Sequence, residues 1–88
     1  MSKAQPRTYR VEFETDRESG MIVVSIPTLN FTGDFGPTVE EALRRLRKLA
    51  AGYIETLLEE REPVPASDAL GSGIFITLAL PRKTALSR

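Results

Sequence analysis

The stretch Thr38-Val-Glu-Glu-Ala-Leu-Arg-Arg-Leu-Arg-Lys-Leu-Ala50 predicts a long helix, and the other elements of the chain are arranged around it. Thr38 is a good N-cap, and Glu41 three positions later completes a capping box. From this point onward apolar residues recur three or four positions apart, so they form one stripe that faces a core. The stripe consists of Val39, Ala42, Leu43, Leu46, Leu49, Ala50, Tyr53, Ile54, Leu57 and Leu58.

The predicted helix ends near Glu60 or Arg61, because Pro63 cannot continue a helix and restricts the residue before it. Gly52 lies inside the helix, where glycine costs about 1 kcal/mol relative to alanine. We therefore expect the backbone of a sheet to approach the helix closely at Gly52. The basic residues of the helix lie mostly off the apolar stripe, and they either form a solvated face or contact RNA or an acidic partner. These residues are Arg44, Arg45, Arg47 and Lys48.

Two strands are predicted before the helix, joined as an antiparallel hairpin. From Tyr9 to Glu14, apolar and polar residues alternate, which is typical of a strand with one buried face. The segment Thr15–Gly20 has the composition of a turn. Met21–Ile26 is rich in β-branched residues and apolar on both faces, so we expect a central strand that Pro27 ends.

Two further strands complete the predicted sheet. Pro27–Pro37 contains a short, irregular third strand between loops, and Pro63–Gly73 is typical of a linker. Ile74–Leu80 is strand-like up to Pro81. If this last strand joins beside the first through a right-handed crossover, it lies parallel to the first strand and at the edge of the sheet. The predicted class is therefore α+β, with a three-stranded antiparallel meander, one long helix and a fourth strand parallel to the first.

The last strand is also the predicted oligomer interface. An edge strand that is apolar on both faces is prone to pair with another chain. We therefore expect a second subunit to cover Ile74–Leu80 in a dimer or tetramer, although an internal strand of a monomer would explain the same pattern. The residues expected at this interface are Ile74, Phe75, Ile76, Leu78 and Leu80.

The composition narrows the classes of function. The chain has 88 residues, enough for one domain, with an expected core at 9–80 and tails at 1–8 and 81–88. Its 12 basic and 12 acidic residues leave zero net charge, which gives no general reason for nucleic-acid binding. Without histidine or cysteine, the commonest general base and thiolate chemistry are missing, so we expect a protein that is not an enzyme and holds no metal or cofactor. We find no signal peptide and no apolar run long enough to span a bilayer, and we expect a cytoplasmic protein that does not contact membranes.

Five segments, in order and at these spacings, resemble the HicB-like antitoxin domain family. The resemblance covers a continuous stretch from about Tyr9 to Pro65, and the ordered set is more specific than any one segment. It departs at Asn30-Phe31-Thr32, where the family often has a Pro-Gly-Cys turn. The five segments are Tyr9-Arg-Val-Glu-Phe13, Val23-Val-Ser-Ile-Pro27, Gly36-Pro-Thr-Val-Glu-Glu-Ala-Leu43, Tyr53-Ile-Glu55 and Pro63-Val-Pro65.

The resemblance implies a partial ribonuclease-H-like fold and an antitoxin role, in which the domain binds a small RNA-cleaving toxin of the HicA type and blocks it. Full-length members of the family usually add a C-terminal element that binds operator DNA. Ile76–Lys83 resembles the entry to such a ribbon-helix-helix element, but the two helices do not follow it, so we do not expect autonomous operator binding. At most, weak contact with nucleic acid is expected from Arg82, Lys83 and Arg88.

Six residues are predicted to bind the partner. The acidic residues among them would complement a basic toxin. The two aromatics lie in a loop, and they either act as interface hot spots or plug the open end of the sheet. The alternative is a stand-alone homo-oligomeric scaffold or regulator of the same fold with no toxin partner. The six residues are Asp16, Glu18, Asn30, Phe31, Asp34 and Phe35.

A ribonuclease-H-like fold also raises the hypothesis of a metal-dependent nuclease, which would need several carboxylates around two metal ions. Glu12 and Glu14 alternate onto the polar face of the first strand, and Asp16, Glu18 and Asp34 fall in turns. Solvation of an exposed sheet face explains these carboxylates as well, and we favour it. No catalytic residue is predicted.

Overall fold

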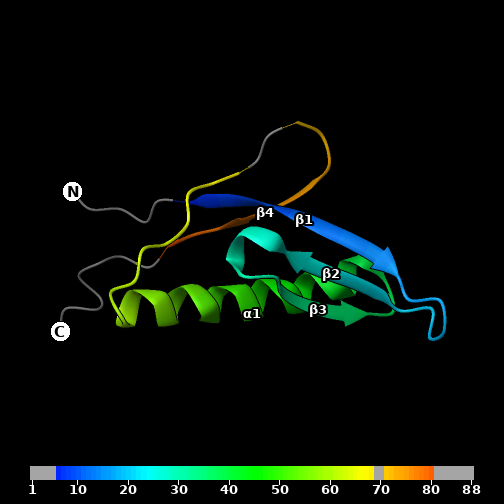
Figure 1. Ribbon diagram of the computed structural model, residues 1–88. Helices are drawn as coiled ribbons and strands as arrows, with labels where there is room; N and C mark the ends of the chain where they lie inside the picture. Colours follow the sequence, from blue (N-terminus) through cyan, green and yellow to red (C-terminus); the bar gives the residue numbers. More distant parts are fainter. Residues whose placement is uncertain (1–5, 69–70, 81–88) are drawn as a thin grey trace.

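A four-stranded antiparallel sheet carries one long helix on one of its faces, which confirms the α+β class (Figure 1). The computed structural model describes residues 6–68 and 71–80. The strands lie in the order β3-β2-β1-β4. The elements are β1 (Arg7–Thr15), β2 (Ile22–Ile26), the 3-10 helix η1 (Pro27–Leu29), β3 (Thr32–Gly36), α1 (Val39–Glu59) and β4 (Ile74–Leu78).

The predicted hairpin forms from β1 and β2, and its turn is held by local hydrogen bonds. The N–H of Asp16 donates to the Met21 carbonyl over 2.8 Å, and the N–H of Gly20 donates to the Asp16 carbonyl. The Asp16 carboxylate accepts both the N–H and the hydroxyl of Ser19. Gly20 has a φ of 75°, which an L-residue rarely adopts. The turn is therefore built by a carboxylate and a glycine, as its composition predicts.

The helix begins and ends where the sequence predicts. Thr38 is the N-cap, and its hydroxyl accepts the Glu41 N–H at 3.1 Å. The last helical residue is Glu59. The expected close approach of the sheet at Gly52 is wrong, because the space around that glycine is open. The close approach lies at Gly36 instead, where an added Cβ would be 2.8 Å from the Ala42 nitrogen.

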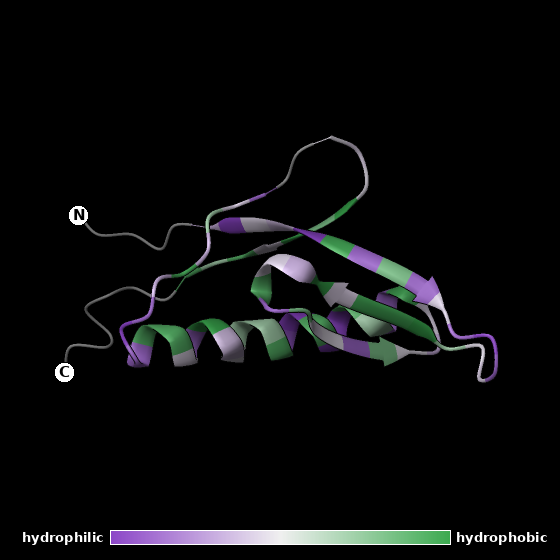
Figure 2. Cartoon of the chain, in the orientation of Figure 1, coloured by the Kyte–Doolittle hydropathy of each residue, from purple (hydrophilic) through white to green (hydrophobic). Residues whose placement is uncertain are grey.

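One hydrophobic core fills the space between the helix and the sheet. Apolar and polar residues alternate along β1, as Figure 2 shows, so one face of that strand enters the core. The Tyr9 hydroxyl lies at the edge of this core and donates to the Pro65 carbonyl at 2.6 Å. The buried core residues are Tyr9, Val11, Val24, Ile26, Leu29, Ala42, Leu46, Ala50, Ile54, Ile76 and Leu78.

The fourth strand lies beside the first at the edge of the sheet, as expected, but its direction is the opposite of the expected one. β4 pairs antiparallel with β1, with Val11 opposite Ile74 and Arg7 opposite Leu78. The expectation of a parallel fourth strand is therefore wrong, and the ribonuclease-H-like description that included it is not confirmed. The physical reason lies in the linker, which does not enter the sheet directly after the helix.

The linker first binds the other edge of β1. β2 ends at Ile26, which leaves the N-terminal half of β1 without a strand partner on that side. Asp68 fills the gap: Oδ1 accepts the Arg10 N–H at 2.8 Å, Oδ2 accepts the Thr28 hydroxyl at 2.5 Å, and its N–H donates to the Thr8 carbonyl at 3.0 Å. The linker therefore runs beside β1 at Thr8 and Arg10 before β4 begins. β4 then starts opposite Val11, in the middle of β1, and runs back antiparallel to it.

The burial of β4 bears on the predicted oligomer interface. Ile76 and Leu78 are only 3% exposed, because this chain's own helix covers them. Ile74 and Leu80 are half-buried against the same core, and only Phe75 points to the opposite face. The oligomer interface at β4 stays a prediction, and the Ile76 and Leu78 side chains already lie in this chain's own core. On the outer edge of β4, Arg47 binds the Thr77 carbonyl.

Within residues 6–68 and 71–80, no helix has the length and apolar character that crossing a membrane requires. Residues 81–88, which include the expected nucleic-acid contacts Arg82, Lys83 and Arg88, lie outside the described residues.

We predict that Asp68→Ala lowers the free energy of unfolding by about 1–3 kcal/mol, because it leaves the Arg10 N–H and the Thr28 hydroxyl without their acceptor. Urea denaturation measures the change. Glu62→Ala is the matched control, since it removes the same charge from an exposed position in the linker. Equal effects of the two substitutions would contradict the role given to Asp68.

The contribution of Asp68 should also depend on pH. Partial burial, the largest effect, raises the pKa of Asp68, but hydrogen bonds from Thr28 and Arg10 and the Arg10 charge outweigh it and hold the pKa below its ordinary value of 3.8. A lowered pKa in the folded state stabilises the fold above the unfolded-state pKa, and that stabilisation is lost as the pH falls through the folded-state pKa. The stability advantage over Asp68→Asn should therefore be constant above about pH 5 and shrink below pH 4. An advantage that grows on acidification would show the sign to be wrong.

Candidate protein-binding surface

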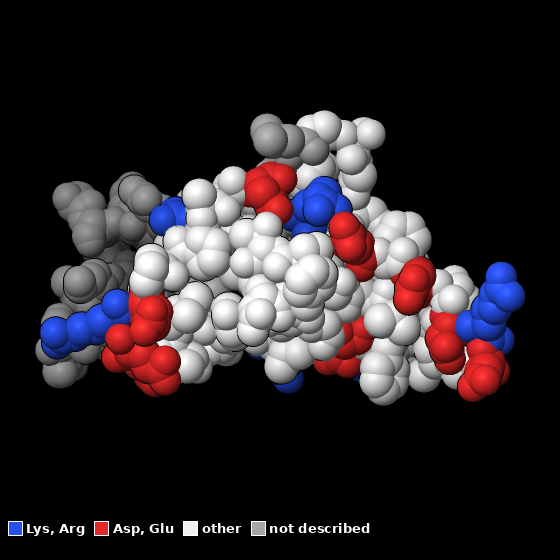
Figure 3. All heavy atoms as spheres, in the orientation of Figure 1, with Lys and Arg blue, Asp and Glu red and all other residues white. Residues whose placement is uncertain are grey.

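One face of the sheet is not covered by the helix. The register places Glu14 opposite Val23, and Val23 opposite Phe35, all on this open face. Phe35 is 50% exposed and Val23 is 36% exposed. Acidic side chains follow the strand toward the turn, as the space-filling view shows along its right-hand side (Figure 3). We call this the hairpin surface, and it consists of Glu12, Glu14, Asp16, Glu18, Val23 and Phe35.

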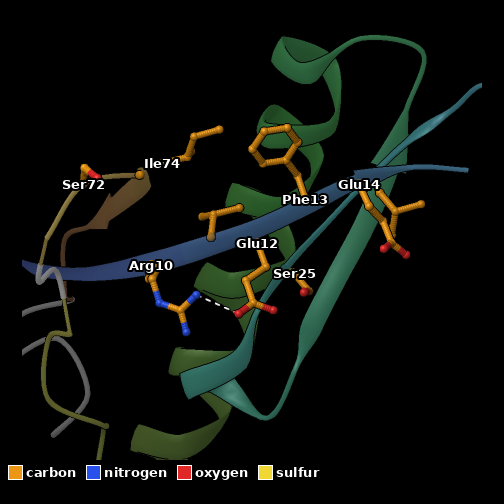
Figure 4. A pocket seen from close by; sticks show the side chains of 10 residues that line it. Arg10, Glu12, Phe13, Glu14, Ser25, Ser72 and Ile74 are labelled. Carbon is orange, nitrogen blue, oxygen red and sulfur yellow. Dashed lines mark hydrogen bonds and ion pairs between the residues drawn. The ribbon is translucent and has the colours of Figure 1, made fainter.

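A groove of about 540 Å³ lies along β1 beside this surface (Figure 4). On its polar side the Arg10 guanidinium pairs with the Glu12 carboxylate at 2.7 Å. On the other side of the strand, Phe13 and Ile74 point the same way, and Phe13 is 52% exposed. The groove therefore combines a polar wall with an apolar one on either side of a single strand.

The charge of the hairpin surface is fixed locally. Hydrogen bonds from the Ser19 hydroxyl and the Ser19 N–H lower the pKa of Asp16, which keeps this carboxylate ionised. None of the ion pairs among the described residues involves Glu14 or Glu18. The turn thus presents carboxylates that are available to a basic partner.

The second predicted loop has a different character. Asn30 and Phe31 both have a φ of 57°, in the left-handed region that favours glycine. Phe31 is 68% exposed despite this strain. The N–H of Phe31 donates to the Pro27 carbonyl, and the Thr32 hydroxyl donates to the Leu29 carbonyl, so the loop is held in this form. A large aromatic is therefore displayed where the backbone conformation disfavours one.

The structure divides the predicted partner-binding residues into two groups. Asp16 and Glu18 lie in the turn that joins β1 to β2, and Phe35 lies on the open face near that turn. Asn30 and Phe31 lie beyond the opposite end of β2 (Figure 1). Asp34, predicted in a turn, belongs to β3 and is half-buried on the helix side, where its carboxylate accepts the Phe35 N–H. Phe31 and Phe35 are both largely exposed, so neither plugs the sheet.

A second groove, of about 520 Å³, lies at the Phe31 end of the sheet, between the start of β3 and the middle of the helix. Leu49 is 47% exposed there, although the sequence places it on the core-facing stripe. Gly52 lines this groove, which is why the space around it is open. The groove residues are Thr32, Lys48, Leu49, Gly52, Tyr53 and Thr56.

The basic cluster of the helix is used within the chain. Arg44 and Arg45 pair with Glu41. Arg45 also donates to the Phe35 carbonyl at 3.0 Å, and Arg47 donates to the Thr77 carbonyl at 2.7 Å. Two arginines therefore reach the outer edges of β3 and β4, a role that the sequence pattern does not suggest.

Sequence reasoning missed Phe13 and Val23 as surface residues. The alternation along the first strand predicts that Phe13 is buried, and the apolar composition of the second predicts the same for Val23. Phe13 is exposed because β1 is nine residues long and β4 only five, a difference that the strand ranges predicted from the sequence do not contain. Among the described residues, no group of three or more carboxylates gathers as a metal site would require, so Glu12 and Glu14 stand as a surface pair.

These features define an α+β domain with an open, partly acidic sheet face that is suited to contact another protein. No family model and no curated protein matches the sequence. Among solved structures, the fold is similar to the crystal structure of the N-terminal domain of Burkholderia pseudomallei antitoxin HicB, with a TM-score of 0.65. The similarity covers 84% of this chain and 98% of that chain at 17% sequence identity, so it shows a shared fold.

We predict that Phe31→Asn raises the free energy of unfolding by about 0.5–1 kcal/mol, because asparagine tolerates the left-handed conformation and an exposed aromatic loses little buried area. Thermal or urea denaturation measures the gain. Phe35→Asn is the matched control, since it makes the same change in a regular strand, where asparagine is disfavoured. A loss of stability of similar size in both variants would show that the loop at Phe31 is not strained.

Proposed function

We propose that this chain is a non-catalytic protein-binding module that binds and neutralises a small, basic, RNA-cleaving toxin of the HicA type. The observation that carries the proposal is the hairpin surface, where exposed apolar side chains lie next to a line of carboxylates. The shared fold with an antitoxin domain supports it, as does the resemblance of the sequence to HicB-like domains.

The chemistry of the hairpin surface suits a basic protein. Phe35 and Val23 supply the exposed apolar centre that interface hot spots need. Glu14 lies beside Val23, and Asp16 and Glu18 lie in the adjacent turn, where these carboxylates would steer a positively charged partner toward the surface. The proposal assigns no catalytic residue, metal or cofactor to the chain.

The second candidate function is a homo-oligomeric scaffold or regulator with no toxin. The observation in its favour is the groove at Leu49 and Gly52, which exposes apolar surface on the helix away from the hairpin. The two candidates differ in what binds the full chain. A small basic protein encoded in an adjacent reading frame should co-purify with it under the first, and only further copies of itself under the second.

The test of the first candidate is co-expression of the full chain with that neighbouring protein. Co-purification and loss of the neighbour's RNA cleavage on mixing would support the proposal. A neighbour that cleaves RNA equally well in the presence of the chain would refute it. The same assay then locates the contact by substitution.

We predict that Glu14→Arg weakens binding of the basic partner by about tenfold or more, since it places a repulsive charge beside Val23 on the hairpin surface. Titration calorimetry measures the affinity. Glu59→Arg is the control, because it makes the same charge change at the far end of α1. If Glu14→Arg binds like the control while Phe31→Ala does not, the contact lies in the Asn30–Phe31 loop instead.

A further inference from the structure

The edge of β1 that faces β4 is only partly paired. β4 pairs with β1 from Arg7 to Val11 and stops there, while β1 continues to Thr15. The N–H groups of successive strand residues point to opposite edges, and that of Arg10 points to the Asp68 side. Those of Phe13 and Thr15 therefore point to the β4 side, together with their carbonyls. No residue in the described part of the chain pairs with these four groups.

Two glycines explain why β4 does not extend to cover this edge. Gly73 has a φ of 141° and Gly71 a φ of 78°, so the chain turns sharply just before Ile74. The space in line with β4, beside Phe13, is thereby left to the groove of about 540 Å³ (Figure 4). Ser72 and Gly73 line one end of it.

On the two outer edges of the sheet, which belong to β3 and β4, side chains of this chain bind exposed backbone groups. On β3, the Phe35 N–H is bound by the Asp34 carboxylate and the Phe35 carbonyl by Arg45. On β4, the Thr77 carbonyl is bound by Arg47. Side chains that occupy these groups oppose pairing with another strand. The Phe13–Thr15 edge has no such protection among the described residues.

A second copy of this chain does not suit the free edge. A symmetric antiparallel pair would have to place Phe13 or Thr15 opposite itself, or the two opposite each other. Each of these registers sets Glu12 or Glu14 against Glu12, Glu14 or Asp16 of the other copy. Like charges directly opposite each other destabilise a strand pair. The occupant must therefore carry a different charge pattern.

We propose that the Phe13–Thr15 edge of β1 accepts an extended segment of a basic partner protein, in which apolar residues alternate with Lys or Arg. Such a strand would form main-chain hydrogen bonds with the four free groups, which is the strand-addition mode of recognition. Its apolar residues would lie beside Phe13 and Ile74, and its cations beside Glu12 and Glu14. The inference deepens the proposed function, because it names the part of the partner that the surface recognises.

The test uses the full chain and the end-blocked peptide Lys-Val-Arg-Val-Lys-Val, with Glu-Val-Glu-Val-Glu-Val as the charge-reversed probe. Amide chemical shifts in NMR titrations report where each peptide binds. Shifts centred on the Phe13 and Thr15 amides with the basic peptide, and weaker binding of the acidic one, are expected. Absence of these shifts, or equal binding of both peptides, overturns the proposal.

Two variants distinguish the contribution of the backbone edge to peptide binding from that of the acidic side chains. Thr15→Pro removes one outward N–H and should bind the basic peptide about fivefold more weakly than Thr15→Ala, which keeps that N–H. If the proline variant does not fold, the double variant Glu12→Lys, Glu14→Lys provides the decision, because it should prefer the acidic peptide. A preference that does not reverse overturns the proposal.

The failure of this inference and that of the proposed function can be told apart. A neighbouring toxin that binds Thr15→Pro as tightly as Thr15→Ala would remove the strand-addition site and leave the antitoxin role in place. If the basic peptide binds at Phe13 but no toxin partner exists, the strand-addition site would stand and the antitoxin role would be refuted.

Discussion

The first strand of this chain has to satisfy hydrogen-bonding groups along two edges with neighbours that are shorter than itself. β2 covers its C-terminal half on one side, and β4 covers its N-terminal half on the other. Asp68 and Ser67 complete the first side from a linker, through the N–H groups of Arg10 and Thr8. The direction of β4 follows from that linker contact, and the uncovered end of β1 follows from the turn at Gly71 and Gly73, after which β4 begins opposite Val11. One requirement of backbone chemistry thus connects the topology to the surface on which the proposed function depends.

The sequence was sufficient for elements whose determinants are local. Thr38 and Glu41 defined the start of the helix, and the alternation around Tyr9 defined the first strand. The direction of β4 could not be predicted, because it depends on Asp68, which lies 58 residues from its partner Arg10 and belongs to no periodic pattern. Gly52 was misjudged for a similar reason, since an open groove and a close contact both favour glycine.

The candidate site was predicted only in part, because its local composition can be read from the sequence but the relative positions of its loops depend on the fold. The acidic character of the Asp16–Gly20 turn was apparent from composition, whereas the sequence left open whether Phe35 is exposed or plugs the sheet. The separation of the turn from Asn30 and Phe31 was not apparent. The two loops are close in the sequence, but β2 lies between them and places them at opposite ends of the sheet. The arginines of α1 show the same limit: their charges suggested nucleic acid or solvent, whereas their geometry assigns two of them to carbonyls at the sheet edges.

The pairing of Arg7 with Leu78 places the start of the first strand and the end of the last at the same end of the domain. The Asp16–Gly20 turn lies at the other end (Figure 1). The chain therefore enters the sheet at Arg7 and leaves it at Leu78 at one pole, while the hairpin turn lies at the opposite pole. Any polypeptide joined directly to Arg7 or Leu78 starts from the pole away from the hairpin, so the two poles can engage different ligands.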